Sequence, residues 1–192
     1  MVSDLVVTAL SACEGIEFSE RAACPDCGGP VQGYDTRIKK FAAILENDRE
    51  RIIHVRVRRF TCKSCGLLCY ADEPFYPDTR IGAPVIDLCV TFSSTLPFSR
   101  TATYLSRIGI AIDRGSVRNY AKRSSGKIPT ADMFGTRLPF SILSLSSLAA
   151  RSGESGGITG TDVLSACGFP STRRAALNHP EEEGQDRQVD RQ

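Results

Sequence analysis

Apolar and polar residues alternate along residues 51–60 and fall on opposite faces of an extended chain: Ile53, Val55 and Val57 against His54, Arg56 and Arg58. This alternation predicts a half-buried β-strand. The turn-rich residues 46–50 come directly before it, so we predict a long β-hairpin with arms at 34–45 and 51–60. Within the first arm, residues 39–45 also fit one or two helical turns, and both interpretations stay open.

Helical spacing of apolar residues replaces this alternation after the proline-rich stretch that follows the hairpin. The pattern predicts three helices: 84–92, 99–108 and 114–123. Pro84 suits a first turn, because its missing N–H has no helical partner there. Ser99 and Asp113 are predicted N-caps, and Gly109 is predicted to end the second helix. Three helices with a glycine-marked turn and a basic last helix indicate a helix-turn-helix unit.

The predicted third helix has an apolar face and a basic face. Val117, Tyr120 and Ala121 lie at i, i+3 and i+4 and are expected to face the core. The remaining side chains are candidates for DNA contacts: Arg114, Ser116, Arg118, Asn119, Lys122 and Arg123. Two arginines of the predicted hairpin, Arg56 and Arg58, are further candidates for DNA contacts. Arginine pairs with guanine and asparagine with adenine, so Arg114, Arg118 and Asn119 are the candidates for base contacts. The alternative is an ordinary amphipathic helix with a solvated basic face.

The C-terminal part has weaker patterns. Apolar residues predict helices over three ranges: 137–151, 159–167 and 171–177. They form either a second small DNA- or partner-binding unit or plain core and dimer-forming helices. Residues 179–192 are charged and nearly without apolar side chains, so we expect them to be disordered.

Together these patterns predict an α+β protein, in which a small β zinc ribbon with a long hairpin precedes an all-α helix-turn-helix and a C-terminal helical segment. We expect five regions: a lead-in (1–20), a zinc ribbon (21–71), the helix-turn-helix (72–127), a helical segment (128–178) and a disordered tail (179–192). The chain of 192 residues has room for one ordinary domain or two small ones.

Two Cys-x-x-Cys pairs, each followed by glycine, flank the predicted hairpin. Their four cysteines are Cys24, Cys27, Cys62 and Cys65. Two such knuckles supply four thiolates to one tetrahedral ion, which makes Zn²⁺ the expected cofactor. The alternative is buried or redox cysteines, although a redox centre needs only one pair within a βαβ pattern. Cys69 is a further ligand candidate that fits a small buried residue better, and His54 fits an exposed side chain better.

Basic charge is concentrated in the middle of the chain. Residues 21–127 contain 18 Lys and Arg against 10 Asp and Glu, whereas the two flanks together contain 6 against 12. Clustered cations favour a polyanionic partner, because binding releases condensed counterions. A solvated basic surface explains the charge equally well.

The first ten residues lack the basic start of a signal peptide, and no apolar run is long enough to span a bilayer. The other four cysteines are scattered, which suits a reducing compartment better than a disulfide framework. We therefore expect a cytoplasmic protein without a membrane partner.

The cysteine pairs, residues 58–62 before the second pair, and the segments 99–105, 109–110 and 113–118 resemble the DNA-binding region of prokaryotic insertion-sequence transposases and related transposon-derived proteins. The resemblance covers about residues 24–123. It implies zinc-dependent folding and recognition of transposon-end or operator DNA. The chain departs from the family in a longer, more charged segment between the knuckles and in the extra Cys69. The 65 residues after Lys127 are also too few for an RNase H-like catalytic core with its metal-binding acids.

The expected function is therefore a zinc-dependent, non-catalytic DNA-binding protein, either a regulator or a truncated mobile-element product. Neither His54 nor His179 has a visible catalytic partner. The expected partner is double-stranded DNA, with homo-oligomerisation open and no small-molecule substrate. The alternative is a zinc-ribbon adaptor that binds protein or RNA through its basic hairpin. DNA binding should depend on Arg114 and Arg118 in the first case, and binding should depend on Arg56, Arg58 and Arg59 in the second.

Overall fold

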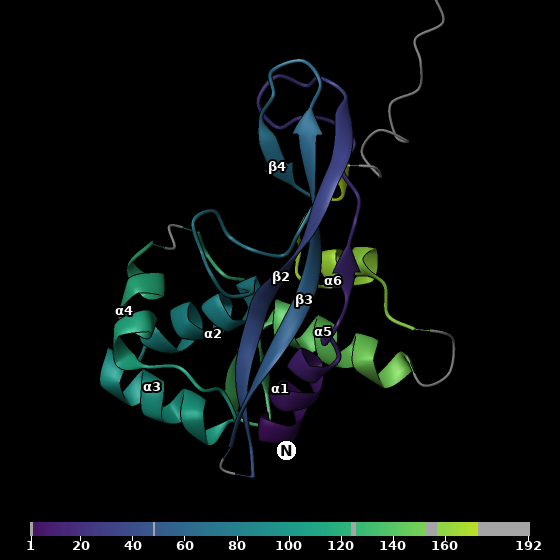
Figure 1. The fold of residues 1–192 in the computed structure, drawn as a ribbon. Coiled ribbons are helices and arrows are strands. Elements are labelled where there is room, and N and C mark those ends of the chain that lie inside the picture. Colours follow the sequence, from purple (N-terminus) through teal and green to yellow (C-terminus); the bar gives the residue numbers. More distant parts are fainter. Residues whose placement is uncertain (1, 48, 124–125, 153–156, 173–192) are drawn as a thin grey trace, which may run out of the picture.

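The computed structural model describes residues 2–47, 49–123, 126–152 and 157–172 and has an α+β fold (Figure 1). A long hairpin of β2 and β3 runs the height of the molecule, and the helices gather around its lower half. Buried side chains from the hairpin and from all the helices named below join one apolar cluster. Within the described part of the chain, no helix has the length and apolar character needed to cross a bilayer.

Strands β2 (Val31–Glu46) and β3 (Arg49–Cys62) pair antiparallel, which confirms the predicted hairpin. Two short strands also pair with β3: β1 (Glu17–Phe18) in parallel and β4 (Leu68–Tyr70) antiparallel. The predicted alternation in β3 is confirmed, because its apolar face is buried and its basic face is exposed.

The first arm is a strand throughout, so the helical alternative for 39–45 is wrong. Its ambiguity has a structural cause. The register shifts between Lys40 and Ala42, which leaves Phe41 as the extra residue of a β-bulge. The bulge breaks the period of two, and four consecutive side chains from Phe41 to Ile44 are buried.

Three helices follow, close to the predicted positions: α2 (Ala83–Ser93), α3 (Phe98–Arg107) and α4 (Arg114–Arg123). The N-cap of α3 is Pro97, so the predicted cap at Ser99 is wrong by two residues. Asp113 caps α4 as predicted, because its carboxylate accepts from the N–H of Ser116 at 2.9 Å. Gly109 follows α3 with a φ of +90°, a conformation that favours glycine.

The connection between α3 and α4 pairs with the edge of the hairpin. Ile110 forms an antiparallel bridge with Ile44, flanked by hydrogen bonds from Leu45 N to Gly109 O at 2.8 Å and from Ala111 N to Ala43 O at 2.9 Å. This connection, residues 108–113, is longer than the three or four residues of a typical helix-turn-helix turn. The pairing fixes the start of α4 relative to the hairpin.

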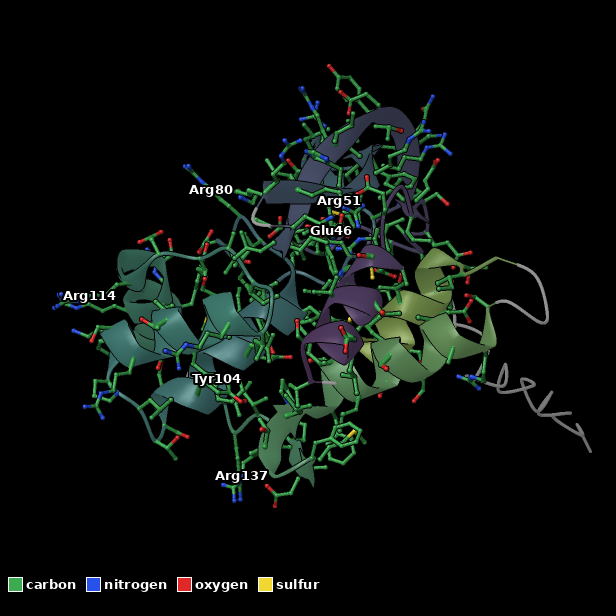
Figure 2. All side chains as sticks on the ribbon, turned by 90° about the horizontal axis from the view of Figure 1, so that it is seen from below. Glu46, Arg51, Arg80, Tyr104, Arg114 and Arg137 are labelled. Atoms are coloured by element: carbon green, nitrogen blue, oxygen red, sulfur yellow. The ribbon has the colours of Figure 1, made fainter. Side chains whose placement is uncertain are left out.

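The N-terminal residues, expected to be an irregular or partly helical lead-in, form α1 (Val2–Ser11) and pack against α5 (Phe140–Arg151). Val6, Ala9 and Leu10 of α1 are buried in the core. At the hairpin turn, Arg51 donates to Ser11 and to Glu46, each at 2.8 Å. Figure 2 labels Glu46 and Arg51 side by side.

A second hairpin, β5 (Thr130–Met133) and β6 (Thr136–Pro139), lies inside the segment predicted to be wholly helical. Its turn places Phe134 and Gly135 at positive φ. Helix α5 therefore begins at Phe140 rather than at 137. Helix α6 (Gly160–Ala166) matches its prediction and starts with a capping box. The predicted helix 171–177, beyond Thr172, and the predicted tail 179–192 lie outside the described residues.

Candidate metal centre and basic surfaces

The two Cys-x-x-Cys pairs meet at the upper end of the hairpin. The sulfur atoms of Cys24, Cys27, Cys62 and Cys65 all lie within 4.8 Å of one another. The Sγ atoms of Cys24 and Cys65 are 3.7 Å apart, and those of Cys27 and Cys62 are 3.5 Å apart. These separations are too long for disulfides, and all four cysteines are free.

The two knuckles have the same backbone hydrogen bonds. In the first knuckle, the Cys24 N–H donates to Gly29 O at 2.9 Å and the Gly28 N–H donates to Cys24 O at 3.0 Å. In the second, Cys62 N donates to Leu67 O at 2.9 Å and Gly66 N donates to Cys62 O at 3.1 Å. Both following glycines have positive φ, +69° at Gly28 and +74° at Gly66. Each knuckle therefore needs its glycine to turn the chain back around the sulfurs.

The electrostatics of the four sulfurs favour a bound cation. The backbone N–H of Cys65, aided by that of Ser64, lowers the pKa of the Cys62 thiol to about 6. The N–H of Leu67 lowers the pKa of Cys65, but the neighbouring thiols of Cys27 and Cys62 outweigh it and raise that pKa to about 12. Four thiolates at this distance repel one another unless a metal ion balances their charge.

The geometry fits zinc. A tetrahedral Zn²⁺ with Zn–S bonds of about 2.3 Å places its sulfur ligands about 3.8 Å apart, close to the separations above. Cys24 and Cys62 are buried, whereas Cys27 and Cys65 are exposed. Neither Cys69 nor His54 belongs to the cluster: Cys69 is buried on β4, and His54 is exposed on β3. The four-cysteine site therefore has the donors and spacing that a metal ion such as zinc requires.

An ion pair that the sequence analysis missed lies beside the ribbon. Asp35 sits in a second irregularity of β2, where the register shifts between Gly33 and Thr36. Its carboxylate accepts from Arg59 Nε at 2.6 Å and also from Nη2. The guanidinium of Arg59 lies 5.6 Å from the Tyr34 ring centroid. A hydrogen bond from Arg59 holds the pKa of Asp35 below its ordinary value.

Most cations of the hairpin have acidic partners. Six ion pairs of the described residues involve them: Arg37–Asp35, Lys39–Glu73, Lys40–Glu50, Arg51–Glu46, Arg56–Glu17 and Arg59–Asp35. Of the two predicted contact residues on this hairpin, Arg56 lies 3.8 Å from Glu17, and Arg58 lies over the Phe60 ring at 5.6 Å. Arg58 has no ion pair within the described part of the chain.

The predicted contact residues of α4 lie together on its outer face. Arg114, Arg118, Asn119, Lys122 and Arg123 are exposed. No ion pair among residues 2–47, 49–123, 126–152 and 157–172 involves any of these four cations. Figure 2 shows Arg114 directed away from the body. Of the predicted inner face, Val117 is fully buried, and Tyr120 and Ala121 are half-buried.

Ser116, another predicted contact residue, forms hydrogen bonds at the start of α4. Its hydroxyl donates to Asp113 at 2.6 Å, and its N–H donates to the same carboxylate. These bonds from Ser116, hydroxyl first, lower the pKa of Asp113. The hydroxyl of Ser116 is therefore used to begin α4.

Comparisons of the chain with protein-family models, with curated proteins and with solved structures find no match. Any functional conclusion therefore has to come from the sites themselves.

Proposed function

We propose that this protein binds double-stranded DNA through α4 and that a zinc ribbon at the upper end of the β2–β3 hairpin completes its binding surface. The observation that carries the proposal is the contrast in charge pairing. The cations of α4 are exposed and have no acidic partner in the described residues, whereas most hairpin cations are paired. Unpaired cations on one helix face are free to contact phosphates.

The way α4 is held supports the same role. Val117 anchors the helix in the core, and the bridge between Ile44 and Ile110 fixes the segment before it. The outward side chains combine candidates for base contacts, Arg118 and Asn119, with phosphate-binding cations. This arrangement would serve as the last helix of a helix-turn-helix like that of the transposase DNA-binding regions that the sequence resembles, with the longer connection as a departure.

A second candidate function has its own observation. The ribbon exposes a group of large apolar side chains, two of which, Tyr34 and Tyr70, lie beside Arg59: Tyr34, Ile38, Leu67, Leu68 and Tyr70. Exposed aromatic and apolar residues beside an arginine suit contact with a protein or with single-stranded RNA bases. The adaptor alternative therefore places binding on the ribbon instead of on α4.

Two double variants separate these functions. Fluorescence anisotropy with duplex DNA over a salt series would compare Arg114→Gln/Arg118→Gln with Arg56→Gln/Arg58→Gln. Arg59 is left unchanged because it pairs with Asp35. We expect the α4 variant to weaken binding strongly. The salt slope should fall by about 1 for each of the two arginines that contacts a phosphate rather than a base.

A matched control removes two exposed arginines away from both surfaces, as Arg137→Gln/Arg151→Gln. It should bind like the unchanged protein. Loss of binding only in the Arg56/Arg58 variant would favour the adaptor function, and equal loss in all three variants would mean that net charge alone drives binding. The proposed role contains no catalytic step, so metal-dependent strand cleavage by the pure protein would contradict it.

A further inference from the structure

A cavity of about 790 Å³ lies between α2, the C-terminal end of α4, α5 and the residues after α6. Its volume falls within the range of small-molecule sites, about 300 to 1,000 Å³. Aromatic rings line it, including those of Tyr76, Phe140 and Phe169. Tyr76 and Phe169 contact each other, with ring centroids 5.5 Å apart. The walls therefore suit an apolar or aromatic molecule.

Asp87 also lines this cavity, and it is the only charged residue of α2, where it is 4% exposed. The Tyr76 hydroxyl donates to Oδ1 at 2.7 Å, and the Ser141 hydroxyl donates to Oδ2 at 2.6 Å. Both partners are neutral, and Asp87 forms no ion pair with any residue that the structure describes. A buried carboxylate without a cation is costly, and burial raises the pKa of Asp87, so a cation bound beside it would stabilise the charged form.

The rest of the cavity narrows the class of ligand. An ammonium group is attracted both by a carboxylate and by the faces of aromatic rings, which here lie in the same cavity. Arg123 and Lys127 line the cavity too and are exposed. Their charges repel a molecule with several positive groups, so a single amine fits better than a polyamine.

We propose that this cavity binds a small molecule with an apolar or aromatic body and one protonated amine, which forms an ion pair with Asp87. The site is separate from the metal centre, and it shares Arg123 with the outer face of α4. The proposal does not depend on DNA binding. It departs from the expectation that the protein has no small-molecule substrate.

The probes are 2-phenylethylamine and its neutral analogue 2-phenylethanol, titrated into the full protein by NMR and isothermal calorimetry. We expect the amine to bind with a Kd of about 1 mM or tighter and at least tenfold more tightly than the alcohol. Asp87→Asn, which keeps an oxygen acceptor for the two hydroxyls, should reduce this preference to about one. Asp132→Asn, at an exposed carboxylate on β5, should leave the preference unchanged.

A second variant tests the cavity itself and keeps Asp87. Ser144→Leu adds bulk to the wall and should abolish amine binding. Three outcomes would overturn the proposal: equal affinity for amine and alcohol, unchanged amine affinity in Asp87→Asn or Ser144→Leu, or no binding of the amine to the unchanged protein. Circular dichroism of each variant establishes that it is folded before its affinity is interpreted.

Discussion

The two halves of the β2–β3 hairpin belong to the same pair of strands, yet different forces hold them in place. In the inner half, residues 39–46 and 49–55, the side chains from Phe41 to Ile44 are buried against the helices. In the outer half, residues 31–38 and 56–62, no side chain of 31–38 is buried, and the buried side chains are Val57, Phe60 and Cys62 of β3. Figure 1 shows this outer half standing above the helical body.

The difference shows what each half needs from the chain. The inner half is stabilised by apolar burial, which depends on many contacts with distant helices. The outer half contributes only two buried side chains to the apolar cluster, Val57 and Phe60 of β3, so the four-cysteine site and the Asp35–Arg59 pair contribute a larger share of its stability. The following predictions test this division, in order of decreasing effect.

Loss of the metal should have the largest effect and should be confined to the outer half. A structural zinc ion contributes about 10 kcal/mol or more to the folding of a small ribbon. Chelation, or Cys62→Ser, is expected to expose the amides of 24–38 and 56–70 to hydrogen exchange while the helices stay protected. Zinc content should fall from one equivalent.

Cys69→Ala is the matched control, because Cys69 is buried near the site but lies outside the cluster. It should keep one equivalent of zinc. If the helices unfold together with the ribbon when the metal is lost, the two halves of the hairpin do not have separate sources of stability.

Phe41→Ala should destabilise the whole protein. Phe41 is fully buried and contacts Phe75 edge to face, with ring centroids 6.0 Å apart. Truncation should lower the free energy of unfolding by about 3 to 5 kcal/mol, measured by urea denaturation. Ile38→Ala in the outer half, where Ile38 is 72% exposed, should change it by less than about 0.5 kcal/mol. Similar losses in both variants would contradict the division.

Asp35→Asn should have the smallest effect. Arg59 lowers the pKa of Asp35 in the folded protein. The pair therefore stabilises the ribbon at any pH above the ordinary pKa of a carboxyl group. This stabilisation is lost as the pH falls through the lowered pKa of Asp35. At neutral pH the variant should speed amide exchange at 33–37 and 58–60 in the zinc-loaded protein. The global unfolding midpoint should not move. Loss of zinc from the variant, or unchanged exchange, would show that the pair has another role.

The elements with a regular pattern could be predicted from the sequence. The alternation of β3, the cysteine pairs and the helical spacing from 84 to 123 depend on neighbouring residues, so they are visible in the chain alone. The predicted N-cap at Asp113 and the predicted helix end at Gly109 are confirmed for the same reason, because a helix cap and a residue with positive φ are local features.

The features that could not be predicted depend on residues far apart in the sequence. The bulge at Phe41 shifts the register of the strand, and four consecutive side chains are buried there, so the pattern of 39–45 looked partly helical. The β5–β6 turn lacks the usual Asn-Gly signal and uses Phe134 at positive φ. In the sequence, Asp87 is a single charged residue within an apolar helix. Its place in a site is visible only in the fold, which brings Tyr76 and Ser141 beside it.

The continuous strand β2 also sets the distance between the segment before α4 and the second knuckle. From Ile44, where the segment before α4 is bridged, β2 runs without interruption to Val31 beside the second knuckle. At about 3.3 Å per residue, and allowing for two bulges, this is a separation of about 40 Å. B-DNA rises by about 3.4 Å per base pair, so a duplex that lies along the hairpin and contacts both α4 and the ribbon would be covered over about 12 base pairs. The strand pair thereby fixes the footprint that nuclease protection should find.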